Sequence, residues 1–429
     1  MKRRIINISI ILIFLSGGCS SIVKYTVPSV SRNVASIYNP SSSPLHPEFV
    51  VYHERPDISR LYIKLFTQEI LFNQANREGK YMARIEVHYE LREVVNGNES
   101  EAVADSTTII YDLDRNEIKD IFFASISLRA FQDKIYSLKV NTTDKLRNKS
   151  SISFLDVDKS SVNTAQNFKV IPFRTGYPSF DKVFNSGDVF SVMYARRDID
   201  SIYVKYYRNT FPLPRPPVTN LSSVRPDFIP DSIFKYAYSD TVNYLLPYEG
   251  MYHIQVDPTQ PGGLTLFNFG KSFPKVSTVD EMIGPLAYLT STAEFDELIN
   301  QTNKKLALDN FWLQTTGNVE TSRELIRIYY NRVFFANYYF SSFKEGWKTD
   351  RGMMFIIYGP PNALAKSAEN EVWTYYRKRG KEPLRFTFAK VKSPYSDNDY
   401  QLERDFVNSM WLQAVQDWRK GKVFYADKL

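Results

Sequence analysis

Apolar and polar side chains alternate with a period of two over much of the chain. From about residue 47 to 158 the alternation is clearest at Ile85, Val87, Tyr89 and Leu91, and Asn96-Gly97-Asn98 separates two such segments. This pattern is typical of half-buried antiparallel strands joined by turns. A second stretch of the same kind runs from about 166 to 270. We therefore predict two immunoglobulin-like β-sandwich modules, over 47–158 and 166–270.

The period changes to that of a helix near Pro274. Thr278-x-x-Glu281 and Ser291-x-x-Glu294 both fit capping boxes, and Thr321-x-x-Glu324 precedes the longest helical pattern. The all-apolar run 353–358 then predicts a short buried strand, followed by strands over 371–377 and 384–391 and a last helix from about Asn408. These elements predict an α+β domain over 275–429.

A helix-to-strand corner is expected at residues 346–352, Gly-Trp-Lys-Thr-Asp-Arg-Gly. We predict positive φ at Gly346, where the helix ends, and a Trp347 ring that folds onto the sheet. Thr349 and Asp350 are short acceptors suited to backbone N–H groups of a turn. Arg351 can pair with Asp350 or with a carboxylate elsewhere in the chain. Tyr358-Gly359-Pro360-Pro361 predicts a stiff exit loop.

This run, the apolar segment after it and Tyr-Gly-Pro-Pro resemble the GWxTD domain family, found chiefly in secreted or lipid-anchored bacterial proteins. The resemblance continues through Trp373-x-Tyr375 and Phe386-x-Phe388 and covers roughly residues 275–410. It implies no particular activity. We assign a structural or docking role to the matching residues, which are Gly346, Trp347, Thr349, Asp350, Arg351, Gly352, Tyr358, Gly359 and Pro360.

The N-terminus reads as a lipoprotein signal peptide over 1–18. Lys2-Arg3-Arg4 is followed by an apolar stretch from Ile5 to Leu15 that is too short to span a bilayer, and small residues precede Cys19. Cys19, the only cysteine, is the expected lipidation site, and an ordinary signal peptide with an incidental cysteine is the alternative. A flexible tether is predicted over 19–46. We expect an outer-membrane lipoprotein that faces the periplasm, with exposure at the cell surface left open.

Composition adds little that points to chemistry. The net charge of +7 is spread along the chain except at Arg377-Lys378-Arg379-Gly380-Lys381, which is most simply a solvated hairpin turn. The sequence has no basic stripe of the kind that binds nucleic acid, so nucleic-acid binding is not expected. The four histidines lack metal-ligand spacing, and we expect His88 and His253 at surface or edge positions of strands. Nucleophile-elbow and phosphate-loop motifs are absent from the sequence, so no cofactor, metal or catalytic residue is predicted.

One modification pattern occurs several times. Four Asp-Ser/Thr-apolar triplets resemble O-glycosylation acceptors of Bacteroidota, with acceptors at Ser106, Ser201, Ser232 and Thr241.

The leading hypothesis is a non-catalytic outer-membrane lipoprotein that presents a GWxTD domain for docking on another cell-envelope protein or complex. A glycan-binding lipoprotein that uses exposed aromatic rings is one alternative. The other is an enzyme whose site is formed by Asp350, Arg351 and Tyr358.

Overall fold

The computed structural model describes residues 33–39, 45–74, 79–118, 120–196, 198–208, 211–219, 221–367, 369–404 and 409–423. The predicted signal peptide and Cys19 lie outside these residues. No helix in the described part of the chain is both long enough and apolar enough to cross a membrane.

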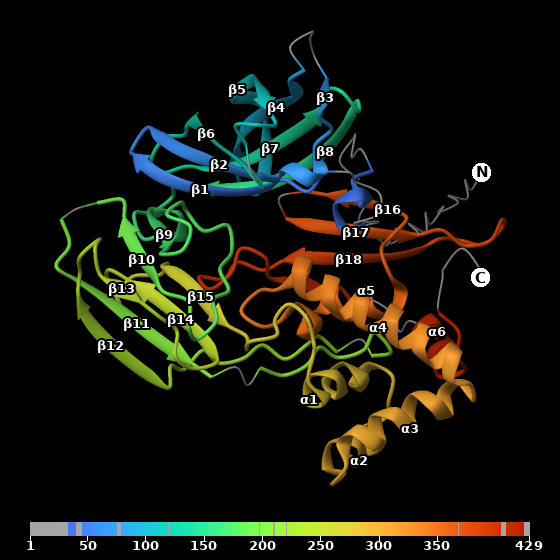
Figure 1. Ribbon diagram of the computed structural model, residues 1–429. Coiled ribbons are helices and arrows are strands. Elements are labelled where there is room, and N and C mark those ends of the chain that lie inside the picture. Colours follow the sequence, from blue (N-terminus) through green and yellow to red (C-terminus); the bar gives the residue numbers. More distant parts are fainter. Residues whose placement is uncertain are drawn as a thin grey trace, which may run out of the picture. The chain divides into compact units, whose positions relative to one another are not determined.

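The first β region contains two antiparallel sheets that share one apolar core (Figure 1). One sheet has the order β1-β2-β6, and the other has the order β3-β4-β7-β8 with β5 paired to β4. The alternation at residues 85–91 falls in β4, where Ile85, Val87 and Leu91 are fully buried. The strands are β1 (Glu48–Arg55), β2 (Ile58–Phe66), β3 (Asn73–Gln74), β4 (Tyr81–Val95), β5 (Asn98–Asp114), β6 (Ile121–Arg129), β7 (Ile135–Asp144) and β8 (Lys149–Asp158).

The second β region also consists of two sheets around a common core. The sheet orders are β13-β10-β9 and β12-β11-β14-β15. No strand covers residues Phe211–Pro217, which form a loop. The strands are β9 (Phe168–Pro172), β10 (Phe190–Tyr194), β11 (Ser201–Tyr207), β12 (Ser232–Ala237), β13 (Asn243–Tyr244), β14 (Gly250–Gln255) and β15 (Leu264–Asn268).

The C-terminal region is α+β, as predicted. Its antiparallel sheet has the order β16-β17-β18-β19, and both predicted capping boxes are present, at Thr278 and Ser291. The basic run 377–381 lies between β17 and β18, so its prediction as a hairpin turn is confirmed. The elements are α1 (Val279–Ile283), α2 (Thr292–Asn300), α3 (Lys304–Thr316), α4 (Val319–Phe340), α5 (Asp350–Tyr358), β16 (Ala363–Lys366), β17 (Asn370–Tyr375), β18 (Leu384–Lys390), β19 (Tyr400–Leu402) and α6 (Ser409–Arg419).

The strand predicted over 353–358 is wrong, because these residues belong to helix α5. Thr349 caps this helix, and all nine of its residues are buried. A helix buried on every side has no polar face, so its sequence shows the same unbroken apolar run as a buried strand. The start of α4 also differs from the prediction: Asn318 caps it, and Thr321 lies inside the first turn.

Short 3₁₀ turns complete the described structure. They are η1 (Ala35–Tyr38), η2 (Thr67–Glu69), η3 (Ala165–Asn167), η4 (Gly284–Tyr288) and η5 (Gly346–Lys348). The first lies within the stretch predicted as a flexible tether, yet Val34, Ala35 and Tyr38 are buried in the core of the C-terminal region. The Val34 amide donates to the Leu364 carbonyl at the edge strand β16 (3.0 Å). Residues 33–38 are therefore part of the C-terminal packing.

Candidate functional site

The motif corner joins α4 to α5 through a very close backbone contact. A Cβ atom at Gly346 would lie 1.9 Å from the Ala336 carbonyl oxygen, and one at Gly352 would lie 1.8 Å from the Gly346 carbonyl oxygen. Glycine is thus required at both positions for lack of space. The positive φ predicted at Gly346 is wrong; that conformation occurs at Gly359 (φ 81°), which follows α5.

Thr349 holds the start of α5. Its hydroxyl donates to the Gly346 carbonyl (2.7 Å) and accepts from the Gly352 amide (3.0 Å). The predicted turn-binding role of Thr349 is confirmed. The Trp347 ring packs against Tyr288 of η4, with ring centroids 6.2 Å apart.

Asp350 is buried and accepts hydrogen bonds from three sides. Its Oδ1 accepts from Arg404 Nη2 (2.6 Å) and from the Ser223 hydroxyl (3.0 Å), and its Oδ2 accepts from the Leu402 amide (3.0 Å). Its ion-pair partner is Arg404. This carboxylate therefore joins the start of α5 to β19 and to the loop that contains Ser223.

Arg351 points to a different cluster, in which Glu371 is the central carboxylate. Arg351 Nη1 lies 3.1 Å from Glu371 Oε1, and Lys366 Nζ lies 2.7 Å from the same oxygen. The Tyr38 hydroxyl also donates to that oxygen (2.7 Å). We predicted that Arg351 pairs either with Asp350 or with a carboxylate elsewhere in the chain. The second of these predictions is correct.

The electrostatics of Glu371 follow from this arrangement. Its side chain is fully buried, and burial raises the pKa, but Lys366 and Arg351 outweigh burial and lower the Glu371 pKa to about 2. The carboxylate is ionised and shared between two cations, as a stable buried charge requires.

Tyr358 lies at the other end of α5 from Asp350. It is 2% exposed and packs against Phe386 (5.2 Å between ring centroids) and Tyr375 (5.6 Å). The eight-residue rise of a helix separates the Cα atoms of residues 350 and 358 by about 12 Å along the axis. The residues of the enzyme alternative, Asp350, Arg351 and Tyr358, thus have separate sets of partners. Pro360 is exposed, beyond the end of α5.

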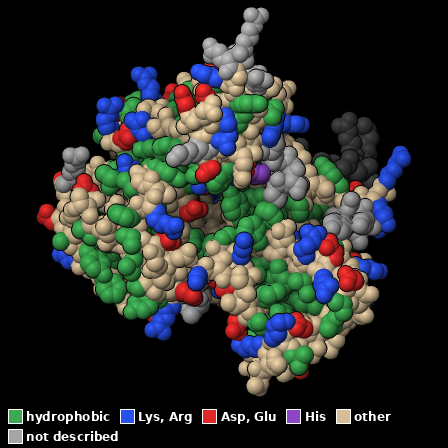
Figure 2. Space-filling view, in the orientation of Figure 1, with side chains coloured by type: hydrophobic (Ala, Val, Ile, Leu, Met, Phe, Trp, Pro, Cys, Tyr) green, Lys and Arg blue, Asp and Glu red, His purple; other side chains and the backbone are tan. Residues whose placement is uncertain are grey.

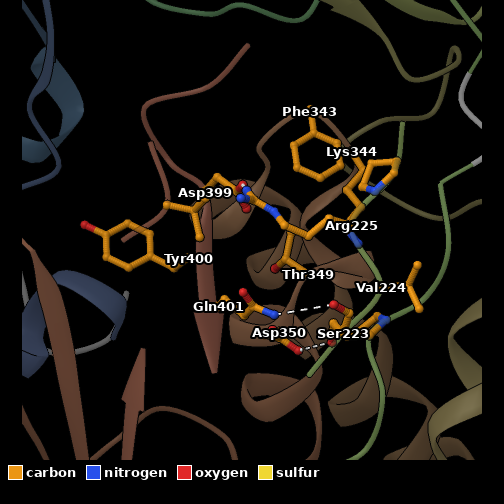
Figure 3. A pocket seen from close by; sticks show the side chains of 13 residues that line it. Ser223, Val224, Arg225, Phe343, Lys344, Thr349, Asp350, Asp399, Tyr400 and Gln401 are labelled. Atoms are coloured by element: carbon orange, nitrogen blue, oxygen red, sulfur yellow. Dashed lines mark hydrogen bonds and ion pairs between the residues drawn. The ribbon is translucent and has the colours of Figure 1, made fainter. Parts of the chain in front are cut away.

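A small polar cavity lies beside the corner (Figure 3). Its volume is about 40 Å³, and its walls include Thr349 and Asp350, together with Ser223, Arg225 and Lys344. Gln401 and Asp350 both approach Ser223 in this view, and the Gln401 amide donates to the Ser223 carbonyl (3.4 Å). A cavity of this size holds one or a few water-sized groups.

Lys344 is a buried cation in the wall of this cavity. It is 8% exposed, and its ammonium donates one hydrogen bond, to the Pro212 carbonyl (3.0 Å). Burial lowers the Lys344 pKa to about 8, although Asp350 and Asp399 act in the opposite direction. The ammonium forms no ion pair with any carboxylate of the described residues.

Other predicted residues lie away from this corner. Ser106 belongs to β5, Ser201 and Ser232 begin β11 and β12, and Thr241 is exposed in the loop between β12 and β13. The surface position predicted for His253 is wrong: it is 2% exposed in β14 and bonded to Thr265 (2.9 Å) and to the Gly262 carbonyl (3.0 Å). Burial lowers its pKa to about 4. Within the described ranges, no cluster of His, Cys, Asp or Glu side chains could hold a metal ion.

Several site residues were not found from the sequence, namely Tyr38, Ser223, Lys344, Glu371 and Arg404. For one of them a signal exists. Glu371 alternates with Trp373 and Tyr375 in β17, and all three are buried. Alternation places such residues on one face of a strand, so a carboxylate on an aromatic face indicates a buried ion pair. Nothing local distinguishes the other four.

Comparison with known proteins supports the resemblance seen in the motif. No curated protein matches the chain in sequence. Among solved structures, a glycosyl hydrolase family 2 member from Bacteroides cellulosilyticus is 9% identical with a TM-score of 0.20, over 37% of this chain and 18% of that one. Red sea bream transglutaminase is 9% identical with a TM-score of 0.19, over 49% of this chain and 28% of that one. Such low TM-scores carry no information on fold or function.

The family comparison is specific. The GWxTD domain model matches residues 250–420, which include the corner, α5 and the four-stranded C-terminal sheet. The match begins at β14, before residue 275, where the resemblance to the family was expected to begin. The C-terminal part of this chain is therefore a GWxTD domain.

Proposed function

We propose that this protein is a non-catalytic outer-membrane lipoprotein whose GWxTD domain docks on another cell-envelope protein. The carrying observation is an apolar surface on α3, in a domain whose motif has its own charged groups bonded internally. Asp350 and Arg351 are both buried and ion-paired within the chain, so the motif acts as a rigid support.

The surface in question is the outer face of α3. Leu308, Phe311 and Trp312 are buried on the inner face, whereas Leu306 and Leu313 are 54% and 39% exposed. Residues seven apart lie on the same face of a helix, so these two leucines form one stripe. Apolar side chains clustered on an outer face favour contact with a partner protein.

The predicted lipid anchor would hold this surface near a membrane. Residues 33–38 are packed into the GWxTD domain, and 14 positions separate Asn33 from Cys19. An extended chain of that length spans at most about 50 Å. Asn33 would accordingly lie within that distance of a lipid on Cys19. We also take the two β regions to be immunoglobulin-like sandwiches, a form supported by the two sheets around each core.

Photocrosslinking in the native envelope tests the docking surface. A photoreactive amino acid at position 306 or 313 is expected to give the same crosslinked protein, and one at position 412 is expected to give none. Leu412 is 55% exposed on α6 and is therefore a matched control. Leu306→Lys combined with Leu313→Lys should abolish co-purification of that protein, whereas Leu412→Lys should preserve it. Equal crosslinking from all three positions would refute docking through α3.

Glycan binding is a second candidate, because β12 carries stacked aromatic rings. Phe234 and Tyr236 are 43% and 44% exposed, with centroids 6.2 Å apart and ring planes 26° apart. Apolar side chains gather over the region of β12 and β13 on the face shown in Figure 2. A glycan array probed with the wild type and with Tyr236→Ala tests this candidate. Binding lost in Tyr236→Ala, but kept in the exposed-tyrosine control Tyr81→Ala, would favour it over docking alone.

A further inference from the structure

Lys344 is a buried cation beside a cavity, and its neighbours leave it without a counter-ion. Both oxygens of Asp350 already accept hydrogen bonds, from Arg404, Ser223 and the Leu402 amide. Asp399, the other carboxylate of the lining, pairs through Oδ2 with Arg225 Nη2 (3.0 Å), and the adjacent Glu345 pairs with Lys348 (2.8 Å). Each carboxylate of the cavity is thus matched by a cation other than Lys344.

Of the charged groups that line the cavity, Lys344 has no ion pair with any described residue. Two cations, Arg225 and Lys344, and two carboxylates, Asp350 and Asp399, line it. Arg225 pairs with Asp399, and Asp350 pairs with Arg404, which lies outside the lining. A buried ammonium that has one carbonyl partner retains two N–H donors. Burying such a group is costly unless an anion or water satisfies it.

The cavity also has an entrance and a small volume. Arg225 and Val224 are more than half exposed, so the cavity reaches solvent beside them. Its volume of about 40 Å³ admits a group the size of a carboxylate. In Figure 3, Lys344 and Arg225 lie on the same side of this space.

We propose that this cavity binds a single carboxylate group, with the Lys344 ammonium as its counter-ion and Arg225 at the entrance. A charge-assisted hydrogen bond from Lys344 would fix one carboxylate oxygen. The carboxylate can belong to a small free anion or to a side chain or C-terminus of a partner protein. This inference does not depend on docking through α3, so the two can fail separately.

The test measures thermal unfolding of the full-length protein in sodium formate or acetate, against sodium chloride of equal ionic strength. Formate and acetate are expected to raise the unfolding midpoint saturably, by about 1–2 °C at ten times Kd, because a ligand stabilises the state that binds it. Lys344→Met should abolish the shift. Lys392→Met, which removes an exposed charge next to the lining residue Val391, should keep it.

A second measurement needs no variant. Reductive methylation of Lys344 in the wild-type protein, followed by mass spectrometry, should slow several-fold in acetate but not in sodium chloride of equal ionic strength. Loss of the acetate effect with Lys344→Met, together with this protection, would support the site. An equal shift in Lys344→Met, or the absence of both a shift and protection in the wild type, would overturn it. If a carboxylate peptide from the crosslinked partner protects Lys344 at lower concentration than acetate does, the partner is the source.

Discussion

Charged side chains are buried on both sides of the motif corner, but their pairing differs between the two sides. Asp350 and Arg351 are adjacent in sequence, yet Asp350 faces the cavity lined by Ser223 and Lys344, and Arg351 faces the closed cluster around Glu371. In the closed cluster both cations contact the same carboxylate oxygen. On the cavity side, the Lys344 ammonium donates to a backbone carbonyl and lies over the Phe343 ring (5.5 Å to the centroid), with no carboxylate partner among the described residues.

Each side of the corner also binds residues that are distant from it in the sequence. The closed cluster binds Tyr38, and the cavity side binds Ser223 through Asp350 and Pro212 through Lys344. A cluster in which every cation pairs with one buried carboxylate stabilises the fold. A cluster with an unpaired cation beside a cavity can bind a ligand, and the difference shows which side of the motif to test for function.

The largest expected effect is that of Glu371→Gln in the closed cluster. This change leaves Arg351 and Lys366 buried without a carboxylate, so the free energy of unfolding should fall by about 3–5 kcal/mol. Denaturant unfolding followed by tryptophan fluorescence measures it. Glu369→Gln, two residues away and exposed, should change stability by less than about 0.5 kcal/mol. A loss below about 1 kcal/mol for Glu371→Gln would show that the closed cluster does not stabilise the domain.

A smaller effect is expected from pH. The Glu371 pKa is lowered in the folded protein to about 2 from an ordinary value near 4.5. A lowered folded-state pKa stabilises the fold above the ordinary value, and this contribution is lost as pH falls from about 4.5 to 2, by up to about 3 kcal/mol. The stability difference between wild type and Glu371→Gln should therefore shrink over that range. A difference that stays constant from pH 6 to pH 2.5 would contradict the ionised state of Glu371.

The smallest expected effect is that of Ser223→Ala on the cavity side. The Ser223 hydroxyl donates to Asp350 (3.0 Å) and accepts from Arg404 (3.1 Å), but Asp350 keeps its other partners. The free energy of unfolding should fall by about 1 kcal/mol. The exposed neighbour Ser222→Ala is the control. A loss as large as that of Glu371→Gln would mean that the two sides are equally structural, and it would weaken the contrast.

Much of the local structure was predictable because it depends on residues close in sequence. Strict alternation identified β4, and Ser or Thr three residues before Glu identified the starts of α1 and α2. The motif located the GWxTD domain. Helix α5 was missed because burial on all sides removes the polar face that distinguishes a helix from a strand.

What the sequence by itself determined is thus the β-rich N-terminal part, the α+β C-terminal part and the presence of a corner at residues 346–352, which joins two helices and not the predicted helix and strand. Only the tertiary structure decided the partners of the charged residues: Glu371 for Arg351, Arg404 for Asp350, and no carboxylate among the described residues for Lys344. The physical reason is distance along the chain. Tyr38 and Glu371 are 333 residues apart, and a hydrogen bond between such positions produces no periodicity or spacing in the sequence from which it could be predicted.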